Sequence, residues 1–235
     1  MKRMQPRLAI AVGLICGLIA CKSPHAQPPV DLESLPSGGG LVTADERHPV
    51  GARLAQRPTW NAGDRFTFRR GNLLDVNLRV EFVDEARYGL IDEDTGGLLL
   101  VDRDLGLLGE GTLDAGEVWN DERFDVRLLP VDPAYAWPLW EGKRWVGQFV
   151  RVQANGSMVP LVAEYRAQGW ERLQTPLGEF DTLRIQRKVR VAQEGQYVER
   201  TALAWYAPEV GQAVRRLEDG LLTELVDWQR QAAQP

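Results

Sequence analysis

Residues 74–82 read Leu-Asp-Val-Asn-Leu-Arg-Val-Glu-Phe, so apolar and polar side chains alternate along the whole stretch. A period of two residues is typical of a β-strand with one buried face and one solvated face. The same alternation recurs over residues 183–191. Further segments of strand-like sequence cover residues 64–70, 87–94, 97–103, 123–129, 143–154, 157–168, 196–206, 211–219 and 221–229. The last segment also fits helical spacing, because Leu221, Leu225 and Trp228 recur at helical intervals.

Short turn sequences separate these segments. They are Asp94-Thr95-Gly96-Gly97, Asn155-Gly156, Glu194-Gly195 and Asp219-Gly220. No helical period is sustained between residues 59 and 220, and a hydrophobic content of 44% is enough to bury a core. We therefore predict a single all-β domain over residues 59–230, with a short tail at 231–235. Its sequential antiparallel strands are expected to form a curved, partly closed sheet of half-barrel or lipocalin-like form.

Residues 60–66 and 139–145 resemble each other. Trp60-Asn-Ala-Gly-Asp-Arg-Phe66 aligns with Leu139-Trp-Glu-Gly-Lys-Arg-Trp145 when Gly63 is placed on Gly142, and strand-like segments follow both. The identities are few, so coincidence and duplication both remain open. A duplication would give two similar meanders joined in one sheet.

The residues that carry acid–base and nucleophilic catalysis are scarce. The chain has two histidines, His25 and His48, and Ser157 has no histidine in the domain to activate it. Neither a G-x-G-x-x-G motif nor a phosphate loop occurs. Residues 102–106 superficially resemble a calcium loop, but Leu105 and Leu107 stand where oxygen ligands should follow, which favours a solvated acidic turn. We predict no enzyme activity, no catalytic residue, no metal site and no cofactor.

Three cations on one predicted strand could hold an anionic headgroup. They are Arg184, Lys188 and Arg190. The alternative, which we favour, is cross-strand pairing with acids such as Glu194 or Glu199, because exposed strand faces are normally charged.

Three tryptophans form a second candidate site. Trp137, Trp140 and Trp145 cluster after Pro130 and Pro133. The segment 129–140 could form a lip over an apolar cavity, with these rings in contact with an apolar ligand. The simpler alternative is that the large rings fill the β core.

The second half of the domain resembles a large group of uncharacterised exported bacterial β proteins. Three motifs carry the resemblance: Trp170-Glu171, then Pro176-Leu-Gly-Glu-Phe-Asp181, then Trp205-Tyr-Ala-Pro-Glu-Val-Gly211. With residues 140–145 upstream, the match covers residues 139–228. The resemblance implies an antiparallel curved sheet and no established activity. Pro176 and Gly178 also suit a turn on their own account.

The first 58 residues read as an export signal and a tether. Six of the 14 prolines and Gly38-Gly39-Gly40 fall within residues 22–58, which predicts a disordered linker with a reach of roughly 30–36 Å. Before it, basic residues precede an apolar run over residues 8–20, which is typical of an export signal and short for a membrane span.

The end of that run, Leu18-Ile19-Ala20-Cys21, resembles the lipobox of bacterial lipoproteins. The resemblance implies cleavage after residue 20 and acylation of Cys21, which gives a lipid anchor with more than one chain. Cleavage also removes Cys16, so no disulfide would remain. Lys22 stands where Asp signals inner-membrane retention, which by the same resemblance favours the outer membrane, facing the periplasm.

These observations favour a non-enzymatic, outer-membrane-anchored periplasmic lipoprotein whose curved sheet binds an apolar ligand or an envelope partner. The alternative is a structural or assembly accessory of an envelope, secretion or polysaccharide apparatus, without a ligand cavity. The mature chain would hold 25 basic and 33 acidic residues, so nucleic acid is not an expected partner.

Overall fold

The computed structural model describes residues 40–43, 47–71, 74–114, 117, 119, 124–193 and 196–231. Every regular element in these residues is a β-strand. The strands are β1 (Gly40–Thr43), β2 (Arg65–Arg70), β3 (Leu74–Val83), β4 (Arg87–Asp92), β5 (Gly97–Asp102), β6 (Leu107–Thr112), β7 (Phe124–Asp132), β8 (Arg144–Gln153), β9 (Met158–Thr175), β10 (Gly178–Gln193), β11 (Gln196–Ala207), β12 (Gln212–Glu218) and β13 (Leu221–Gln229). None of the described residues belongs to a helix long and apolar enough to cross a membrane.

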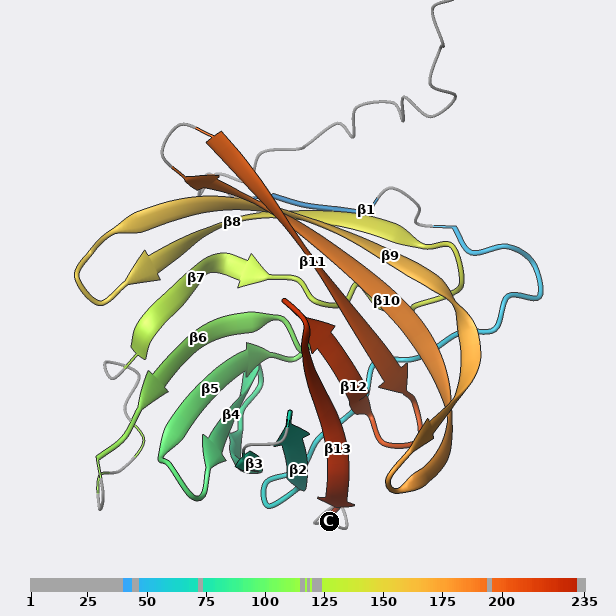
Figure 1. Ribbon diagram of the computed structural model, residues 1–235, viewed down its shortest axis with the longest axis horizontal. Helices are drawn as coiled ribbons and strands as arrows, with labels where there is room; N and C mark the ends of the chain where they lie inside the picture. The colour runs from blue at the N-terminus through green and yellow to red at the C-terminus, as the bar shows by residue number, and fades with distance from the viewer. Residues whose placement is uncertain are drawn as a thin grey trace, which may run out of the picture.

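Strands β2 to β13 form a closed antiparallel barrel (Figure 1). Each strand pairs with its neighbours in the chain, and β13 pairs with β2 to complete the ring. The prediction of an all-β fold with sequential antiparallel strands is confirmed. The ring closes further than expected because residues 221–229, whose spacing also suited a helix, form a strand that joins β12 to β2.

Three strands of the barrel, β6, β9 and β10, differ most from the expected segments. β6 was not expected, because its sequence Leu-Leu-Gly-Glu-Gly-Thr is short and its two glycines interrupt the alternation. The hairpin of β9 and β10 extends to a turn at residues 176–177, which lies inside the Pro176 to Asp181 motif. As that motif suggests, Gly178 has a positive φ of 121° directly after the turn.

The barrel consists of two similar halves, β2 to β7 and β8 to β13. Gly63 and Gly142 precede the first strand of each half with φ angles of 88° and 90°. Gly63 N donates to Val80 O at 2.8 Å, and Gly142 N donates to Ala167 O at the same distance, so each glycine pairs with the second strand of its own half. This matched geometry supports the prediction of two similar meanders.

One end of the barrel, which we call the closed end, is filled by three connecting segments. Residues 47–60, 133–142 and 208–211 meet there, and Ala55 and Leu139 form a two-hydrogen-bond bridge with N···O distances of 2.8 and 2.9 Å. Trp60 Nε1 donates to Gly211 O at 3.0 Å. The closed end therefore consists of side chains and backbone packed against each other.

Residues 47–58, which the sequence assigns to a disordered tether, lie against this end. Ala55 is buried, and Arg53 forms an ion pair with Asp181 at 2.6 Å. These residues are held in place by the bridge between Ala55 and Leu139, which the proline content of the segment does not predict. β1 also adds to the barrel, beside residues 145–148 of β8, where β7 no longer pairs with that strand. The rest of the predicted tether, except residues 40–43, and the signal with Cys21 lie outside the described residues.

Candidate functional site

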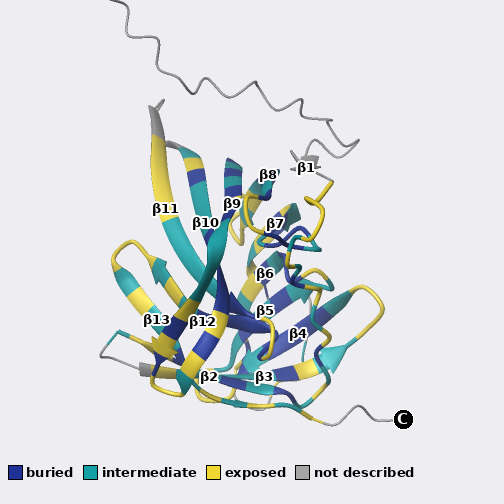
Figure 2. Cartoon of the chain, turned by 90° about the vertical axis from the view of Figure 1, so that its right-hand side faces the viewer, coloured by how far each residue is buried: buried dark blue, intermediate teal, exposed yellow. Residues whose placement is uncertain are grey.

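The other end of the barrel, which we call the mouth, is formed by the alternate set of turns. In an antiparallel meander successive connections lie at opposite ends, so the turns after β4, β8 and β12 share the end opposite the closed one. The stretch of β11 that lies towards this side, residues 198–201, is exposed and is drawn yellow in Figure 2. The mouth is where solvent can reach the inner face of the sheet.

The strand register identifies which side chains face the lumen. Directly paired residues on neighbouring antiparallel strands lie on the same face of a sheet. One such row runs from the fully buried Trp145 through Tyr165, Arg187 and Ala202 to Glu218. Because Trp145 and Tyr165 belong to the core, Arg187 and Glu218 also face inward.

Arg187 belongs to a buried polar network on the lumen wall. Its Nε donates to the Tyr165 hydroxyl at 3.1 Å, and its Nη2 donates to Asp132 Oδ2 at 2.5 Å. The Tyr165 hydroxyl donates in turn to Asp132 Oδ1, and the Trp145 ring stacks on Tyr165 with centroids 5.2 Å apart. Burial, followed by the negative charge of Asp132, holds the pKa of Tyr165 well above its usual value. The network thus keeps a protonated phenol and a fixed guanidinium at the base of the mouth.

A second arginine, Arg216 on β12, also faces the lumen; β11 lies between it and Arg187 on β10. Arg216 is paired with Ala204, which is paired with the buried Ile185, so Arg216 also faces inward. Its Nη2 donates to Gln212 Oε1 at 3.0 Å, and it lies beside the buried Tyr135, whose pKa burial raises although the Arg216 charge opposes this. Unlike the core residues around it, Arg216 is exposed.

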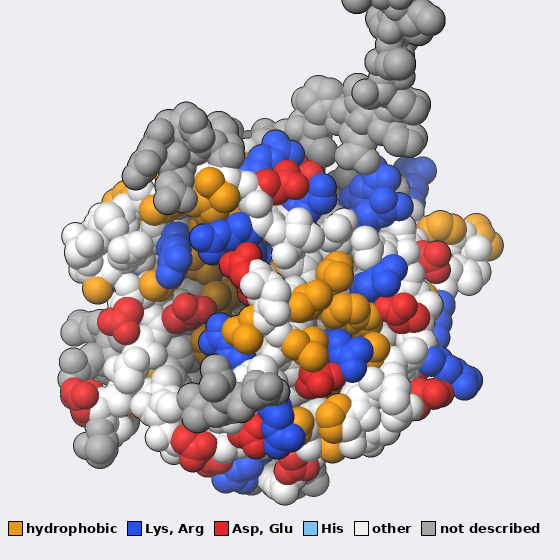
Figure 3. All heavy atoms as spheres, in the orientation of Figure 1, with side chains coloured by type: hydrophobic (Ala, Val, Ile, Leu, Met, Phe, Trp, Pro, Cys, Tyr) orange, Lys and Arg blue, Asp and Glu red, His pale blue; other side chains and the backbone are white. Residues whose placement is uncertain are grey.

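Apolar side chains line the lumen around these arginines and remain accessible to solvent. They pack against the core cluster yet are only half-buried, and they include Val76, Leu78, Leu99, Val101, Leu107, Val126, Val159 and Val191. Figure 3, which looks at this side of the molecule, shows apolar side chains recessed between Lys, Arg, Asp and Glu side chains. The mouth therefore combines an apolar wall with charged groups.

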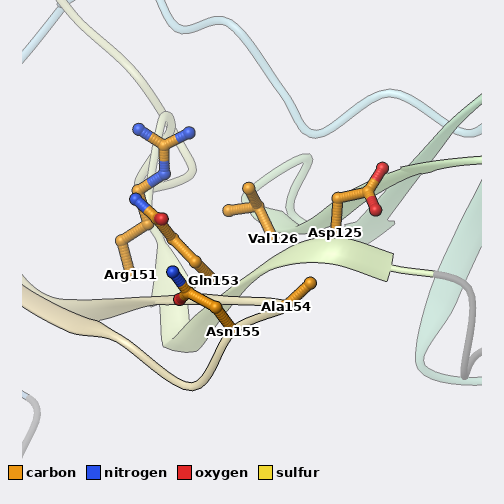
Figure 4. A pocket seen from close by; sticks show the side chains of 6 residues that line it. All are labelled: Asp125, Val126, Arg151, Gln153, Ala154 and Asn155. Carbon is orange, nitrogen blue, oxygen red and sulfur yellow. The ribbon is translucent and has the colours of Figure 1, made fainter.

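A shallow hollow marks the rim of the mouth at the start of β7 and the end of β8 (Figure 4). It has a volume of about 420 Å³ and is lined by Asp125, Val126, Arg151, Gln153, Ala154 and Asn155. Val126 pairs with Gln153, and Arg151 pairs with the buried Leu128. These four residues therefore lie on the inner face of the sheet, at its edge nearest the mouth. The hollow is wide open, and we regard it as the edge of the mouth.

The predicted tryptophan site lies largely in the packed core. Trp145 and Trp140 are buried, and Trp145 Nε1 donates to Pro133 O at 2.8 Å. Trp140 lies beneath the ammonium of Lys143, which is 4.3 Å from the ring centroid. Trp137 is half-buried at the closed end, where its Nε1 donates to Asp104 O at 2.9 Å. The contact of these rings with an apolar ligand stays a prediction.

Other predicted features have ordinary structural roles. Lys188 and Arg190 both approach Glu199, at 3.5 and 3.9 Å, which confirms the expected cross-strand pairing. Asp102 Oδ1 accepts hydrogen bonds from the backbone N of Asp104 and Gly106, which confirms the acidic turn. The described part of the chain contains no group of three or more His, Cys, Asp or Glu residues placed to hold a metal ion.

Arg187 and Arg216 are the lumen residues that the sequence analysis missed. Arg187 stands at an apolar position of the alternating pattern, between Ile185 and Val189. The sequence therefore already indicates a charged residue on the inner face. Arg216 carried no such signal, because β12 is short and a bulge near Trp205 shifts its register.

No family model matches the sequence, and no curated protein matches it. Three solved structures show a similarity in fold. The hypothetical lipoprotein YmcC from Escherichia coli has a TM-score of 0.48 and 13% identity, over 74% of this chain and 90% of that chain. A protein from Bacteroides fragilis described as exported, with a YmcC-like fold, has a TM-score of 0.42 and 14% identity, over 75% of this chain and 100% of that one.

A protein from Parabacteroides distasonis described as a lipoprotein has a TM-score of 0.46 and 11% identity, again over 75% of this chain and 100% of that one. Likenesses of this degree carry no activity, ligand or location over to the present chain.

Proposed function

We propose that this protein is a non-enzymatic lipoprotein of the cell envelope that binds an apolar molecule in the lumen of its barrel. Acylated Cys21 would anchor it, and Lys22 favours the outer membrane as the site of anchoring. The barrel would then receive its ligand through the mouth. The proposal for the anchor rests on the lipobox resemblance, and the proposal for binding rests on the lumen.

The observation that carries the binding proposal is the half-exposure of the apolar lumen wall. Inward-facing side chains of a filled barrel are buried, whereas Leu99, Val126 and Val159 keep contact with solvent. Covering apolar surface contributes roughly 25 cal/mol per Å², so an apolar ligand gains free energy by replacing that water.

A lumen-blocking variant tests the proposal. The mature chain without the signal and Cys21, residues 22–235, retains every described residue and avoids the lipid anchor. We expect it to bind the neutral dye N-phenyl-1-naphthylamine with a rise in fluorescence. Ala202→Phe places a large ring on the inner face of β11 and should abolish binding. Leu203→Phe places the same ring on the outer face of the same strand and should leave binding intact.

Failure of the unaltered chain to bind the dye would overturn the proposal, as would equal effects of the two phenylalanine variants. Circular dichroism and urea unfolding of both variants show whether each keeps the fold.

A second candidate function has one observation in its favour. The ladder between β11 and β12 ends at Ala202 and Glu218, so residues 198–201 pair with no described strand on that side. An unpaired strand edge can accept a strand from another protein. An assembly accessory that uses this edge would form a protein adduct when a photocrosslinker replaces Thr201 in the intact envelope, whereas a lumen carrier would not.

A further inference from the structure

We infer that the lumen ligand is an anionic amphiphile, and that Arg216 and Arg187 bind its acidic headgroup on the inner face of β10, β11 and β12. The inference rests on the proposed lumen function and adds the chemical class of the ligand. It concerns a carboxylate or a phosphate attached to an apolar chain.

The two arginines flank a strip of small side chains. Arg187 on β10 pairs with Ala202, and Arg216 on β12 pairs with Ala204, so β11 separates them with methyl groups only. Strands lie about 4.8 Å apart and rise about 3.4 Å per residue, so two strand spacings and a stagger of two residues place the two arginine backbones roughly 12 Å from each other. Ala202 and Ala204 are only half-buried. The strip therefore places no side chain larger than a methyl group between the two arginines.

Both guanidinium groups are held in place with donors to spare. An arginine has five N–H donors. Arg187 uses Nε and Nη2 on Tyr165 and Asp132, while its Nη1 meets only Glu218 at 3.9 Å. Arg216 uses Nη2 on Gln212 and lies against Tyr135. Guanidinium groups with free, fixed donors suit bidentate binding of carboxylate and phosphate.

Arg216 differs in its partners from two arginines of the outer face, Arg215 and Arg190. Its chain neighbour Arg215 faces outward and forms an ion pair with Glu224 at 2.5 Å, and Arg190 likewise pairs with Glu164. Arg216 forms no ion pair with any described acidic residue. Arg216 thus faces an apolar lumen without a carboxylate partner, and the acidic headgroup of a ligand would supply that partner.

Besides Asp132, which holds Arg187 in place, one further acid lies near this site, and a ligand could displace it. The side chain of Glu218 is 61% exposed, and 3.9 Å from Arg187 Nη1 is longer than a hydrogen bond. A ligand anion with better geometry would replace Glu218 at that nitrogen. Glu218 would then weaken binding through repulsion, so its removal should strengthen it.

Two further arginines lie at the approach to the lumen. The register places Arg151 and Arg200 on the inner face near the mouth, on a chain whose net charge is -5. Arg200 is paired only with the exposed Asp219, at 3.3 Å. Positive side chains at the entrance of an acidic protein favour the approach of anions to that entrance.

Four ligands with the same twelve-carbon chain test the inference by displacing N-phenyl-1-naphthylamine from residues 22–235, below their micelle concentrations. They are dodecanoate, dodecyl phosphate, monododecanoyl glycerol and dodecyltrimethylammonium. We expect each acid to bind about tenfold or more tightly than the neutral glycerol ester, the scale of a charged hydrogen bond. The cation should bind more weakly than the glycerol ester. The stronger of the two acids identifies carboxylate or phosphate as the preferred headgroup.

Three variants assign the effect to residues. Arg216→Gln should remove most of the preference for acids and leave the affinity for the glycerol ester unchanged. Glu218→Gln should increase the affinity for both acids. Arg215→Gln, the adjacent outward arginine, should change neither. Unfolding curves for each variant confirm that the fold is kept.

The outcomes separate the two proposals. Equal binding of acids, ester and cation would overturn the headgroup inference and leave the apolar lumen standing. The headgroup inference would also be overturned if the preference for acids were unchanged in both single variants, Arg216→Gln and Glu218→Gln. Absence of dye and ligand binding in the unaltered chain would overturn both.

Discussion

Asp132 and Arg187 lie 55 residues apart in the chain and meet inside the barrel, with Arg187 Nη2 2.5 Å from Asp132 Oδ2. Asp132 is the last residue of β7, beyond Leu129, the last β7 residue that pairs with β8. The side-chain network therefore holds the end of β7 where the backbone ladder to β8 has stopped. Tyr165 completes the link, since it contacts both groups.

Tyr165→Phe should lower the free energy of unfolding by about 1–3 kcal/mol, because it leaves Asp132 Oδ1 and Arg187 Nε without that buried partner. Urea unfolding followed by tryptophan fluorescence measures the loss. Tyr206→Phe is the matched control, since the Tyr206 hydroxyl has no hydrogen bond to another described side chain and its loss should cost less. Equal losses in the two variants would contradict a special role for the network.

Alkaline pH should destabilise the barrel. Burial raises the pKa of Tyr135, Tyr165 and Tyr206 above the ordinary value. A group with a raised folded-state pKa contributes stability that is complete below its unfolded pKa and is lost as the pH rises towards its folded-state pKa. The free energy of unfolding should therefore fall from about pH 10 upward.

Urea unfolding at a series of pH values measures this dependence, and tyrosinate absorbance should show these phenols titrating late. The Tyr165→Phe variant should lose less stability over the same pH range. An unfolding free energy that stays constant above the ordinary tyrosine pKa would contradict the prediction.

The three tryptophans of the predicted lip should differ in their contribution to stability. Trp145→Ala should cost about 3–5 kcal/mol, because the ring is fully buried and stacked on Tyr165. Trp140→Ala should cost a similar amount. Trp137→Ala should cost less, since Trp137 is half-buried. Dye binding measured on the same variants tests the ligand role: weaker binding by Trp137→Ala at nearly unchanged stability would support it, and unchanged binding would contradict it.

The alternation of residues made the strands predictable from sequence, but it did not fix what lies inside the ring. The pattern over residues 74–82 corresponds to β3, with Leu78 and Val80 facing Phe66 and Leu90 in the interior. The same pattern cannot show how far a barrel is filled, because that depends on connections from elsewhere in the chain. Leu139 reaches the closed end through its bridge to Ala55, 84 residues earlier in a segment that read as a tether.

For the lumen arginines too, the sequence predicts the face of a strand on which a residue lies but not the residues that it contacts across the barrel. Arg187 could be assigned to the inner face from its place between Ile185 and Val189. Its partner Asp132 could not be found, because the contact joins β7 to β10 through the interior, and only the closed ring brings them together. Arg216 depends on the register shift near Trp205, which decides the face on which each β12 residue lies.

The turn at Gly142 should require its left-handed backbone. Gly142→Ala should lower the free energy of unfolding by about 1–2 kcal/mol, the cost of a positive φ for a residue with a Cβ. The new methyl group would meet no atom within 4 Å, so the cost reflects the backbone alone. Gly142→Asn should cost less, because asparagine tolerates this region. Equal losses from alanine and asparagine would contradict the assignment to backbone strain.

The lipid anchor can be tested by comparing the two cysteines of the chain. Cys21→Ser removes the thiol to which acyl chains would be attached, so the precursor should remain unprocessed or leave the membrane fraction. Cys16→Ser makes the same atomic change five residues earlier, inside the apolar run, and should be processed normally.

Metabolic labelling with a palmitate analogue should mark the unaltered chain and Cys16→Ser and leave Cys21→Ser unlabelled. Stable anchoring needs more than one acyl chain, because each buried methylene contributes only ~0.8 kcal/mol, so loss of the single acylation site should leave any processed protein without an anchor. Normal processing and full membrane association of Cys21→Ser would show that residues 18–21 are not a lipobox, and the lumen proposals would then apply to a protein held in the envelope by other means.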